Sequence, residues 1–398
     1  MIEKKLRIAV VSDLHCHPSS KVDETGRRID ATYLYSDLLR NPEHPIESLT
    51  DLLKEEKVDL ILCPGDFTNQ SDKQGFISGW NYALELKDHF KADEIIATIG
   101  NHDVDSRNNY SDYSIEIPKK IKKNFPFKND ELRKSFWAEG FAFIEKDNFR
   151  ILVINSCHFH FNKNKSTSGE VDSDLLKSVD DYLNENTEHK IQLMMCHHHP
   201  VRHSMFNLGE EDEIINSENL LNLLRKHKFD LIIHGHKHNP LLTYCNPTNI
   251  NKIAIFSSGS FSAKTNLSYT GIKNFFHIID IQKDNEVKGV IKSWTYQPQV
   301  GWQKKYEENT FMPPCTGFGS KKTTTQIVNE IVDLLNNKMY EKWENVRNLI
   351  PDIDCVIPEE AKRIQKELED RNYALDKDFN NFPNRIYNNN KLDQEYGG

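Results

Sequence analysis

Carboxylates and histidines recur directly after short apolar runs in this sequence, and these residue types suit the binding of metal ions. The segment 232–240 reads IIHGHKHNP, which places His236 and His238 two residues apart. Asp13 and His15 have the same spacing in SDLHCHP. On extended backbone, residues two apart point the same way, so each pair presents two donors to one side. Carboxylate oxygens and imidazole nitrogens together favour Mn²⁺, Fe or Zn²⁺ over Ca²⁺ and Mg²⁺.

Three further polar clusters follow apolar runs: PGDFTN with Asp66, GNHD with Asn101, His102 and Asp103, and CHHHP at 196–200. Ligand sites of open α/β sheets gather beyond the carboxyl ends of the strands, so we expect the five clusters to converge. A single metal ion could not coordinate all the donors of the five clusters. The set therefore predicts two divalent transition-metal ions about 3.5–4 Å apart, with Asp66 shared between them. We expect Mn²⁺ first, with Fe or Zn²⁺ as alternatives.

The elements that must position these clusters are strands and helices in alternation. Near-continuous apolar character indicates strands that are covered on both faces. We expect such strands at 6–12, 58–63, 94–99, 149–156, 190–196 and 229–234, with helices from 45, 79, 172 and 216. After 252, apolar runs separated by short turns predict antiparallel strands. The fold class is therefore α/β with mixed sheets.

Composition divides the chain into four parts. We expect a catalytic domain at 1–300, a connector at 301–322, a helical extension at 323–375 and a disordered or linker tail at 376–398. The extension carries an apolar stripe at helical spacing, which includes Ile327 and Ile331. This stripe either packs on the catalytic domain or forms a contact with a second copy or a partner protein.

Charge and cysteine usage exclude several classes of protein. A net charge of −9 and an isoelectric point near 6 give no general attraction to nucleic acid, although 119–134 is a basic stretch that we expect to be a solvated surface. The seven cysteines show no C-x-x-C pair, which suits free thiols in a reducing compartment. No apolar run approaches the ~18 residues of a membrane span. We therefore expect a cytoplasmic protein without a membrane partner.

The five clusters, in this order, resemble the motifs of the calcineurin-like metallophosphoesterase superfamily. The motifs D-x-H, G-D, G-N-H-[DE], H-x-P and G-H-x-H stand here at 13–15, 65–66, 100–103, 198–200 and 235–238. The resemblance spans roughly 6–262 and implies a sandwich of two mixed sheets flanked by helices. It also implies ligands. Asp13, His15, Asp66 and His238 would hold the first ion, and Asp66, Asn101, His198 and His236 the second.

The same resemblance implies the catalytic roles. A hydroxide that bridges the two ions would attack the phosphorus atom. His102 would be the general acid, poised by Asp103, which would fix the tautomer of the imidazole. Within CHHHP the ligand is assigned by its distance from the proline, and His197 or His199 could replace His198. His199 and Arg202 are candidates for contact with the substrate. We interpret His158 and His160 as packed or solvent-facing residues.

The second and third motifs narrow the substrate. GDFTNQ lacks the arginine of the G-D-x-V-D-R-G motif in the Ser/Thr protein phosphatases, which argues against that activity. GNHD and GHKH look more like the bacterial branches that cleave phosphodiesters. We expect hydrolysis of a nucleotide-type phosphodiester, with Tyr110, Tyr113 or Phe206 stacking on a base. A nuclease of DNA or RNA similar to the SbcD type is the alternative, and a protein phosphatase or a non-catalytic scaffold is disfavoured.

Overall fold

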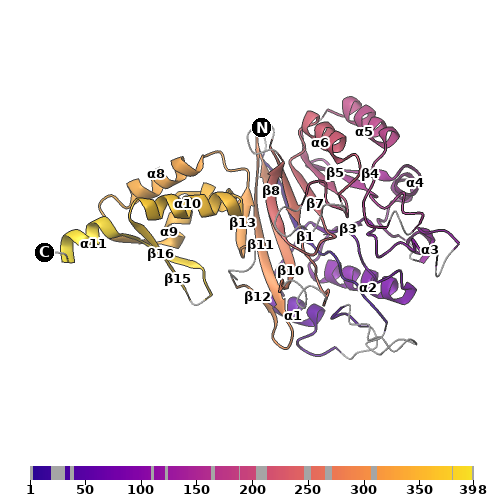
Figure 1. Ribbon diagram of the computed structural model, residues 1–398, viewed down its shortest axis with the longest axis horizontal. Helices are drawn as coiled ribbons and strands as arrows, with labels where there is room; N and C mark the ends of the chain where they lie inside the picture. The colour runs from indigo at the N-terminus through magenta and orange to yellow at the C-terminus, as the bar shows by residue number, and fades with distance from the viewer. Residues whose placement is uncertain are drawn as a thin grey trace.

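The computed structural model describes residues 3–18, 32–35, 40–108, 112–121, 124–162, 166–187, 189–202, 213–245, 252–264, 271–305, 312–378 and 380–396. Two mixed sheets with flanking helices form the larger part, and a smaller unit from the C-terminal quarter of the chain lies beside it (Figure 1). The expected α/β sandwich is thereby confirmed. None of the helices described is long and apolar enough to cross a membrane.

The first sheet joins the N-terminal parallel strands to the late antiparallel ones. Its order is β12 (Gly301–Gln303), β11 (Val287–Gln297), β10 (Asn274–Lys283), β1 (Lys4–Val10), β2 (Leu60–Cys63) and β3 (Glu94–Ala97), with β13 (Cys315–Phe318) paired to β11. β1, β2 and β3 run parallel, whereas β10 runs antiparallel to β1. The carboxyl ends of β1, β2 and β3 therefore share one edge, where three of the polar clusters begin.

The second sheet brings the remaining clusters to the same region. Its order is β4 (Phe141–Glu145), β5 (Phe149–Ile154), β6 (Ile191–Met195), β7 (Leu231–His234), β9 (Ile253–Ser257) and β8 (Leu241–Cys245). β5, β6, β7 and β9 are parallel, and β4 and β8 close the edges antiparallel. One apolar cluster contains residues of both sheets, including Ile8, Leu62, Val153 and Ile233, so the sheets pack face to face.

Helices cover the outer faces of the sandwich. α1 (Pro45–Leu52) and α2 (Lys73–His89) share an apolar cluster with the first sheet, and α5 (Ser173–Glu185) and α6 (Ser217–Lys226) share one with the second. α3 (Glu116–Ile121) and α4 (Asp130–Glu139) connect β3 to β4. Asp172 begins α5 as an N-cap, because its side chain accepts from the backbone N–H of Leu175 at 2.7 Å.

The C-terminal unit has a core of its own. It contains α8 (Thr324–Leu334), β14 (Tyr340–Lys342), α9 (Trp343–Leu349), the 3₁₀ helix η2 (Pro351–Cys355), α10 (Pro358–Asp370), β15 (Tyr373–Lys377), β16 (Pro383–Asn388) and α11 (Asn389–Tyr396). Ile327 and Ile331 of α8 pack with Ile364 and Leu368 of α10. The apolar stripe of the extension is therefore buried within the unit itself, which neither sequence alternative anticipated.

The tail predicted to be disordered contains regular structure. β16 pairs with both β14 and β15, and Ile386 of β16 is fully buried in the core of the unit. The expectation of disorder at 376–398 is therefore wrong for β16 and α11. The composition is polar because a short strand on a small core buries only alternate side chains, and here Ile386 supplies the apolar contact.

Candidate metal centre

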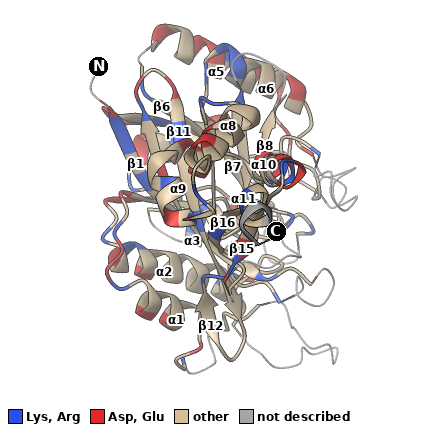
Figure 2. Cartoon of the chain, turned by 90° about the vertical axis from the view of Figure 1, so that its left-hand side faces the viewer, with Lys and Arg blue, Asp and Glu red and all other residues tan. Residues whose placement is uncertain are grey.

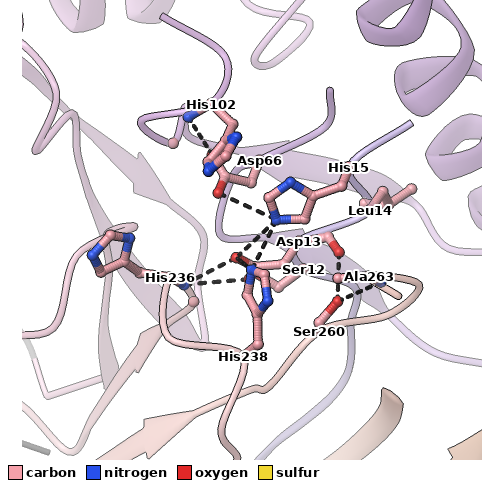
Figure 3. Close-up of polar contacts among 12 residues, drawn as sticks. Ser12, Asp13, Leu14, His15, Asp66, His102, His236, His238, Ser260 and Ala263 are labelled. Carbon is pink, nitrogen blue, oxygen red and sulfur yellow. Dashed lines mark hydrogen bonds and ion pairs between the residues drawn. The ribbon is translucent and has the colours of Figure 1, made fainter. Parts of the chain in front are cut away.

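The polar clusters of both sheets meet at the carboxyl ends of their parallel strands. Asp13 and His15 follow β1, Asp66 follows β2 and Asn101 follows β3, whereas His236 and His238 follow β7 of the other sheet. Figure 3 shows the side chains of Asp13, His15, Asp66 and His238 directed toward one another. The sequence prediction that these distant segments converge agrees with this geometry.

A first group of donors surrounds a space that suits one ion. Asp13, His15, Asp66 and His238 each offer an atom within 4.8 Å of the others. The Nε2 atoms of His15 and His238 are 2.8 Å apart, and Nε2 of His238 lies 3.3 Å from Oδ1 of Asp13. These are the four residues that the resemblance assigns to the first ion. Two carboxylates and two imidazoles fit a divalent transition metal.

A second group of donors adjoins the first. Oδ1 of Asn101 lies 3.1 Å from Nε2 of His197 and 3.1 Å from Nδ1 of His236. Oδ2 of Asp66 lies 3.4 Å from the same His197 nitrogen and 3.5 Å from Nε2 of His15. This oxygen is buried and has no hydrogen-bond partner. A buried carboxylate oxygen without a hydrogen bond, between two sets of nitrogen donors, fits a ligand shared by two cations.

The structure places His197, and not His198, in this second group. Nδ1 of His197 donates to the carbonyl oxygen of Pro64 at 2.9 Å, so Nε2 is the nitrogen that faces Asn101 and Asp66. Nδ1 of His198 instead lies 2.8 Å from the hydroxyl of Ser156. Of the three histidines considered for CHHHP, His197 is therefore the one whose ring nitrogen adjoins Asn101 and Asp66.

His102 is held beside the donors by its backbone. Its N–H donates to Oδ1 of Asp66 at 2.8 Å, and its ring lies edge-on to that of His15 with centroids 4.6 Å apart. The backbone N–H of Gln70 points at Nδ1 of His102 over 3.5 Å. The proton of a neutral imidazole would then reside on Nε2. His102 therefore lies next to the donors Asp66 and His15 and need not be a metal ligand itself.

Asp103 does not contact the imidazole of His102 in the way that the sequence suggested. Its carboxylate accepts from the backbone N–H groups of Asp66 at 2.8 Å, Thr68 at 3.0 Å and Gly100 at 3.0 Å. These three bonds tie the loop after β2 to the loop after β3. Asp103 therefore contacts the backbone of Asp66, and the N–H of Gln70 lies beside His102 where the sequence suggested Asp103.

The backbone around the donors is strained. Asp13, His15, Asp66, His236 and His238 all have positive φ, between 50° and 79°. Such conformations cost L residues of order 1–3 kcal/mol each and gather at functional sites. Gly65 is required between two of the loops, because a Cβ there would lie 2.5 Å from the backbone nitrogen of Gly100.

The electrostatics of the buried rings suit metal binding. Burial and the neighbouring histidines lower the pKa values of His15 and His236 well below the ordinary value. Both rings are neutral near pH 7, which is the form that binds a cation. Burial alone would also lower the pKa of His197, but the charge of Asp66 raises it to about 9. Binding of a cation there would have to displace that proton.

The residues expected to face the substrate differ in their burial and in their distance from the candidate metal centre. His199 is buried, and its ring stacks on that of His236 with centroids 5.7 Å apart. Arg202 is an exposed residue whose Nε lies 3.3 Å from Oε1 of Glu213. Tyr113 is exposed and lies beneath the ammonium group of Lys120. Tyr110 and Phe206 lie outside the described residues. Of these candidates, His199 adjoins the centre.

Comparisons with known proteins agree with the motif pattern. A model of the calcineurin-like phosphoesterase family (Metallophos) matches residues 6–240, and a second model, wHTH-Calcineurin_assc, matches 316–370. A search of curated proteins returned no match. Several solved structures are similar to the chain at low identity.

Three of these structures illustrate the range of TM-scores and coverages. A purple acid phosphatase from yellow lupin (Lupinus luteus) is 14% identical, with a TM-score of 0.47, 74% of this chain covered and 52% of that chain. GAP50 of Plasmodium is 16% identical, with a TM-score of 0.39 and coverages of 77% and 91%. A conserved uncharacterized protein (predicted phosphoesterase) from Streptococcus pneumoniae is 13% identical, with a TM-score of 0.29 and coverages of 75% and 96%. The chain thus spans about half the length of the lupin enzyme.

Proposed function

The chain belongs to the calcineurin-like phosphoesterase family, and on that premise we propose that it hydrolyses phosphodiester bonds of a nucleotide-type substrate with two divalent metal ions. The observation that carries the proposal is the position of Asp66. Its Oδ2 lies between Nε2 of His15 and Nε2 of His197, at 3.5 and 3.4 Å, which is where a shared ligand of two ions belongs. When bound, such a pair lowers the pKa of water and polarises the phosphoryl oxygens.

The residues would divide between the two ions as follows. Asp13, His15, Asp66 and His238 would hold the first, and Asp66, Asn101, His197 and His236 the second. This set combines oxygen and nitrogen donors without sulfur, which supports Mn²⁺ as the first choice and Fe or Zn²⁺ as alternatives. Asp103 would keep Asp66 in place through the three backbone bonds described above.

His102 would protonate the leaving oxygen. Burial lowers the pKa of His102, so the ring is neutral near pH 7. With Gln70 N–H directed at Nδ1, the proton resides on Nε2, from which a neutral imidazole can donate. General-acid catalysis of this kind contributes about 10²–10⁴ to the rate, most for esters with poor leaving groups.

The charge distribution supports a small substrate. α10 has an acidic excess, with the acidic residues Glu359, Glu360, Glu367, Glu369 and Asp370 against the basic residues Lys362, Arg363 and Lys366. In Figure 2 the red segments along α8 and α10 mark acidic residues of the C-terminal unit. A surface that follows a nucleic-acid backbone requires a basic excess instead.

The free, mostly buried cysteines also agree with the reducing compartment expected from the sequence.

A metal-dependent nuclease is the second candidate, and one observation favours it. Lys119, Lys120, Arg133 and Lys134 line a surface hollow of about 610 Å³ together with Trp137. Cations beside an aromatic ring could contact a nucleic-acid strand. Lys120 is, however, paired with Glu116, and Lys134 with Glu131, so part of this charge is already compensated.

A substrate panel with Mn²⁺ tests the proposal. The panel contains cyclic nucleotides, linear dinucleotides, single-stranded and duplex DNA, RNA and a phosphopeptide, and Asp66→Asn is the blank. We expect the highest kcat/KM on a small nucleotide diester and loss of turnover in the variant. Preference for DNA or RNA would instead favour the nuclease. A fully metal-loaded protein that cleaves no diester would rule out both.

A further inference from the structure

A second cluster of metal-binding side chains lies beside the centre and takes no part in the function proposed above. Cys157, His160 and His198 each offer one donor atom, and these atoms lie within 4.8 Å of one another. Cys157 and His160 come from the turn after β5, and His198 comes from the segment after β6. β5 and β6 are parallel neighbours, so their carboxyl ends bring the three residues together.

All three side chains are fully buried, and their hydrogen bonds leave ring nitrogens available as metal ligands. Nε2 of His160 lies 2.8 Å from the carbonyl oxygen of Ser168, so this nitrogen carries the proton. The lone pair then resides on Nδ1, which is buried and has no hydrogen-bond partner. This is the arrangement in which metal-binding imidazoles usually occur, with the second nitrogen oriented by a carbonyl group.

The ring of His198 also has one nitrogen without a hydrogen-bond partner. Its Nδ1 lies 2.8 Å from the hydroxyl of Ser156 and 4.0 Å from Sγ of Cys157, and its Nε2 is buried without a hydrogen-bond partner. Gly169 closes over this ring, since a Cβ at that position would lie 2.8 Å from Cβ of His198. Buried polar atoms are nearly always bonded in folded proteins, yet the rings of His160 and His198 each have one nitrogen without a partner. The Cys157 thiol, whose sulfur lies 4.0 Å from Nδ1 of His198, donates only a weak bond to the carbonyl oxygen of Ile99 at 3.6 Å. A cation bound by all three side chains would use these groups.

We propose that Cys157, His160 and His198 form a third metal site that binds a single thiophilic ion, Zn²⁺ above all, separate from the pair held around Asp66. One thiolate and two imidazoles suit Zn²⁺ and leave a further position for water or Ser156. Binding releases the thiol proton of Cys157 to solvent as the sulfur becomes a ligand. The dinuclear set contains no sulfur, so the two sites differ in the ion that they prefer.

The position of the site gives it a role. The ring of His198 lies 4.5 Å from that of His236 and 5.1 Å from that of His197, measured between centroids. An ion at Cys157, His160 and His198 would fasten the turn after β5 to the segment that carries His197. It would thereby hold a donor of the dinuclear centre in place without contacting the substrate.

Cobalt substitution of the full-length chain tests the proposal, because sulfur bound to Co²⁺ gives a charge-transfer absorption that oxygen and nitrogen ligands do not. The protein is stripped with a chelator and titrated with Co²⁺. We expect the sulfur band in the unaltered protein and its loss in Cys157→Ser. Cys196→Ser is the matched control, since the Cys196 thiol is equally buried and donates to the carbonyl of His198 at 3.1 Å, a bond that serine can also make.

Asp66→Asn separates this proposal from the proposed function. That variant should lose the dinuclear ions and activity and yet keep the sulfur band. If Cys157→Ser does not fold, His160→Ala provides the test, since it keeps the sulfur but should weaken Co²⁺ binding at this site about tenfold or more. Absence of the band from the folded, unaltered protein, or its persistence in folded Cys157→Ser, would overturn the proposal.

Discussion

Nε2 of His197 lies 3.1 Å from Oδ1 of Asn101, although the two residues are 96 positions apart in the chain. Asn101 follows β3 of the first sheet, and His197 follows β6 of the second. The centre therefore spans the junction of the two sheets, and its geometry depends on how they pack. This contact is the reason why we propose His197 as the ligand from CHHHP.

Removal of His197 should damage the second ion position. In His197→Ala, Asn101, Asp66 and His236 lose the nitrogen between them, and we expect the affinity for the second ion to fall by about 10–100-fold or more. Turnover of a diester with Mn²⁺ and binding of Mn²⁺ by calorimetry measure the effect. His189→Ala is the control, because that exposed ring contacts only the carbonyl of Asp284 in the bonds described. Unchanged Mn²⁺ affinity and turnover in His197→Ala would return the role to His198.

Removal of the imidazole at position 102 should separate chemistry from metal binding. His102→Ala keeps every proposed ligand, so its metal content should equal that of the unaltered protein. We expect kcat to fall by about 10²–10⁴ on esters with poor leaving groups and much less on p-nitrophenyl esters, whose leaving group needs no proton. The dependence of kcat on the pKa of the leaving group measures this. An equal loss on both kinds of ester would contradict an acid role.

Asp103→Asn should lower the stability of the protein, because it disturbs the hydrogen bonds that the carboxylate accepts from three backbone N–H groups. The amide replaces one accepting oxygen by a donor that faces an N–H group, so a buried bond to Asp66, Thr68 or Gly100 is lost. We expect the free energy of unfolding to fall by about 1–3 kcal/mol, together with a loss of metal affinity. Urea denaturation and metal content measure the two effects. If Asp103 instead acted through the ring of His102, its substitution would have no further effect in a His102→Ala background.

Acid should destabilise the protein through His277. This ring lies in the first sheet between Phe256 and Phe275, with Nδ1 2.8 Å from the hydroxyl of Ser293 and Nε2 2.8 Å from the carbonyl oxygen of Ser258. Burial lowers the pKa of His277 to about 3. The unfolded chain takes up this proton near pH 6.5, whereas the folded chain resists it. The contribution of the neutral ring is therefore complete above about pH 6.5 and is lost as the pH falls toward 3.

The size of this effect follows from the linkage of protonation to folding. Each pH unit in that interval should cost about 1.4 kcal/mol, so about 2 kcal/mol separates pH 6.5 from pH 5. Urea unfolding at several pH values measures the slope, and His277→Gln lacks it. Parallel stability curves for the two proteins would show that His277 does not resist protonation. Other buried histidines contribute equally to both curves and cancel.

Much of the fold follows from the sequence because buried parallel strands leave a simple pattern. Runs such as VDLILC and FDLIIH became β2 and β7, and Asp66 and His236, which follow them after one or two Pro or Gly residues, lie at the candidate metal centre. Asp13 and His15 lie together as expected, and so do His236 and His238. The physical reason differs from the expected one, because these residues follow the strands with positive φ and do not lie on extended backbone.

Other features were not predictable because they depend on contacts between distant segments. The direction of the Asp103 carboxylate is set by N–H groups of the loop after β2, which adjacency to His102 in the sequence does not reveal. The offset between His197 and His198 depends on where β6 ends. Cys157 and His160 have a recognisable C-x-x-H spacing, but their third partner lies across the junction between β5 and β6.

Anomalous diffraction from Mn²⁺-loaded crystals tests the central claim most directly, since it locates ions without reference to activity. The account predicts two peaks about 3.5–4 Å apart, one on each side of the Asp66 carboxylate. The first should adjoin His15 and His238, and the second should adjoin Asn101 and His197. A single peak, or a pair that Asp66 does not bridge, would contradict the account.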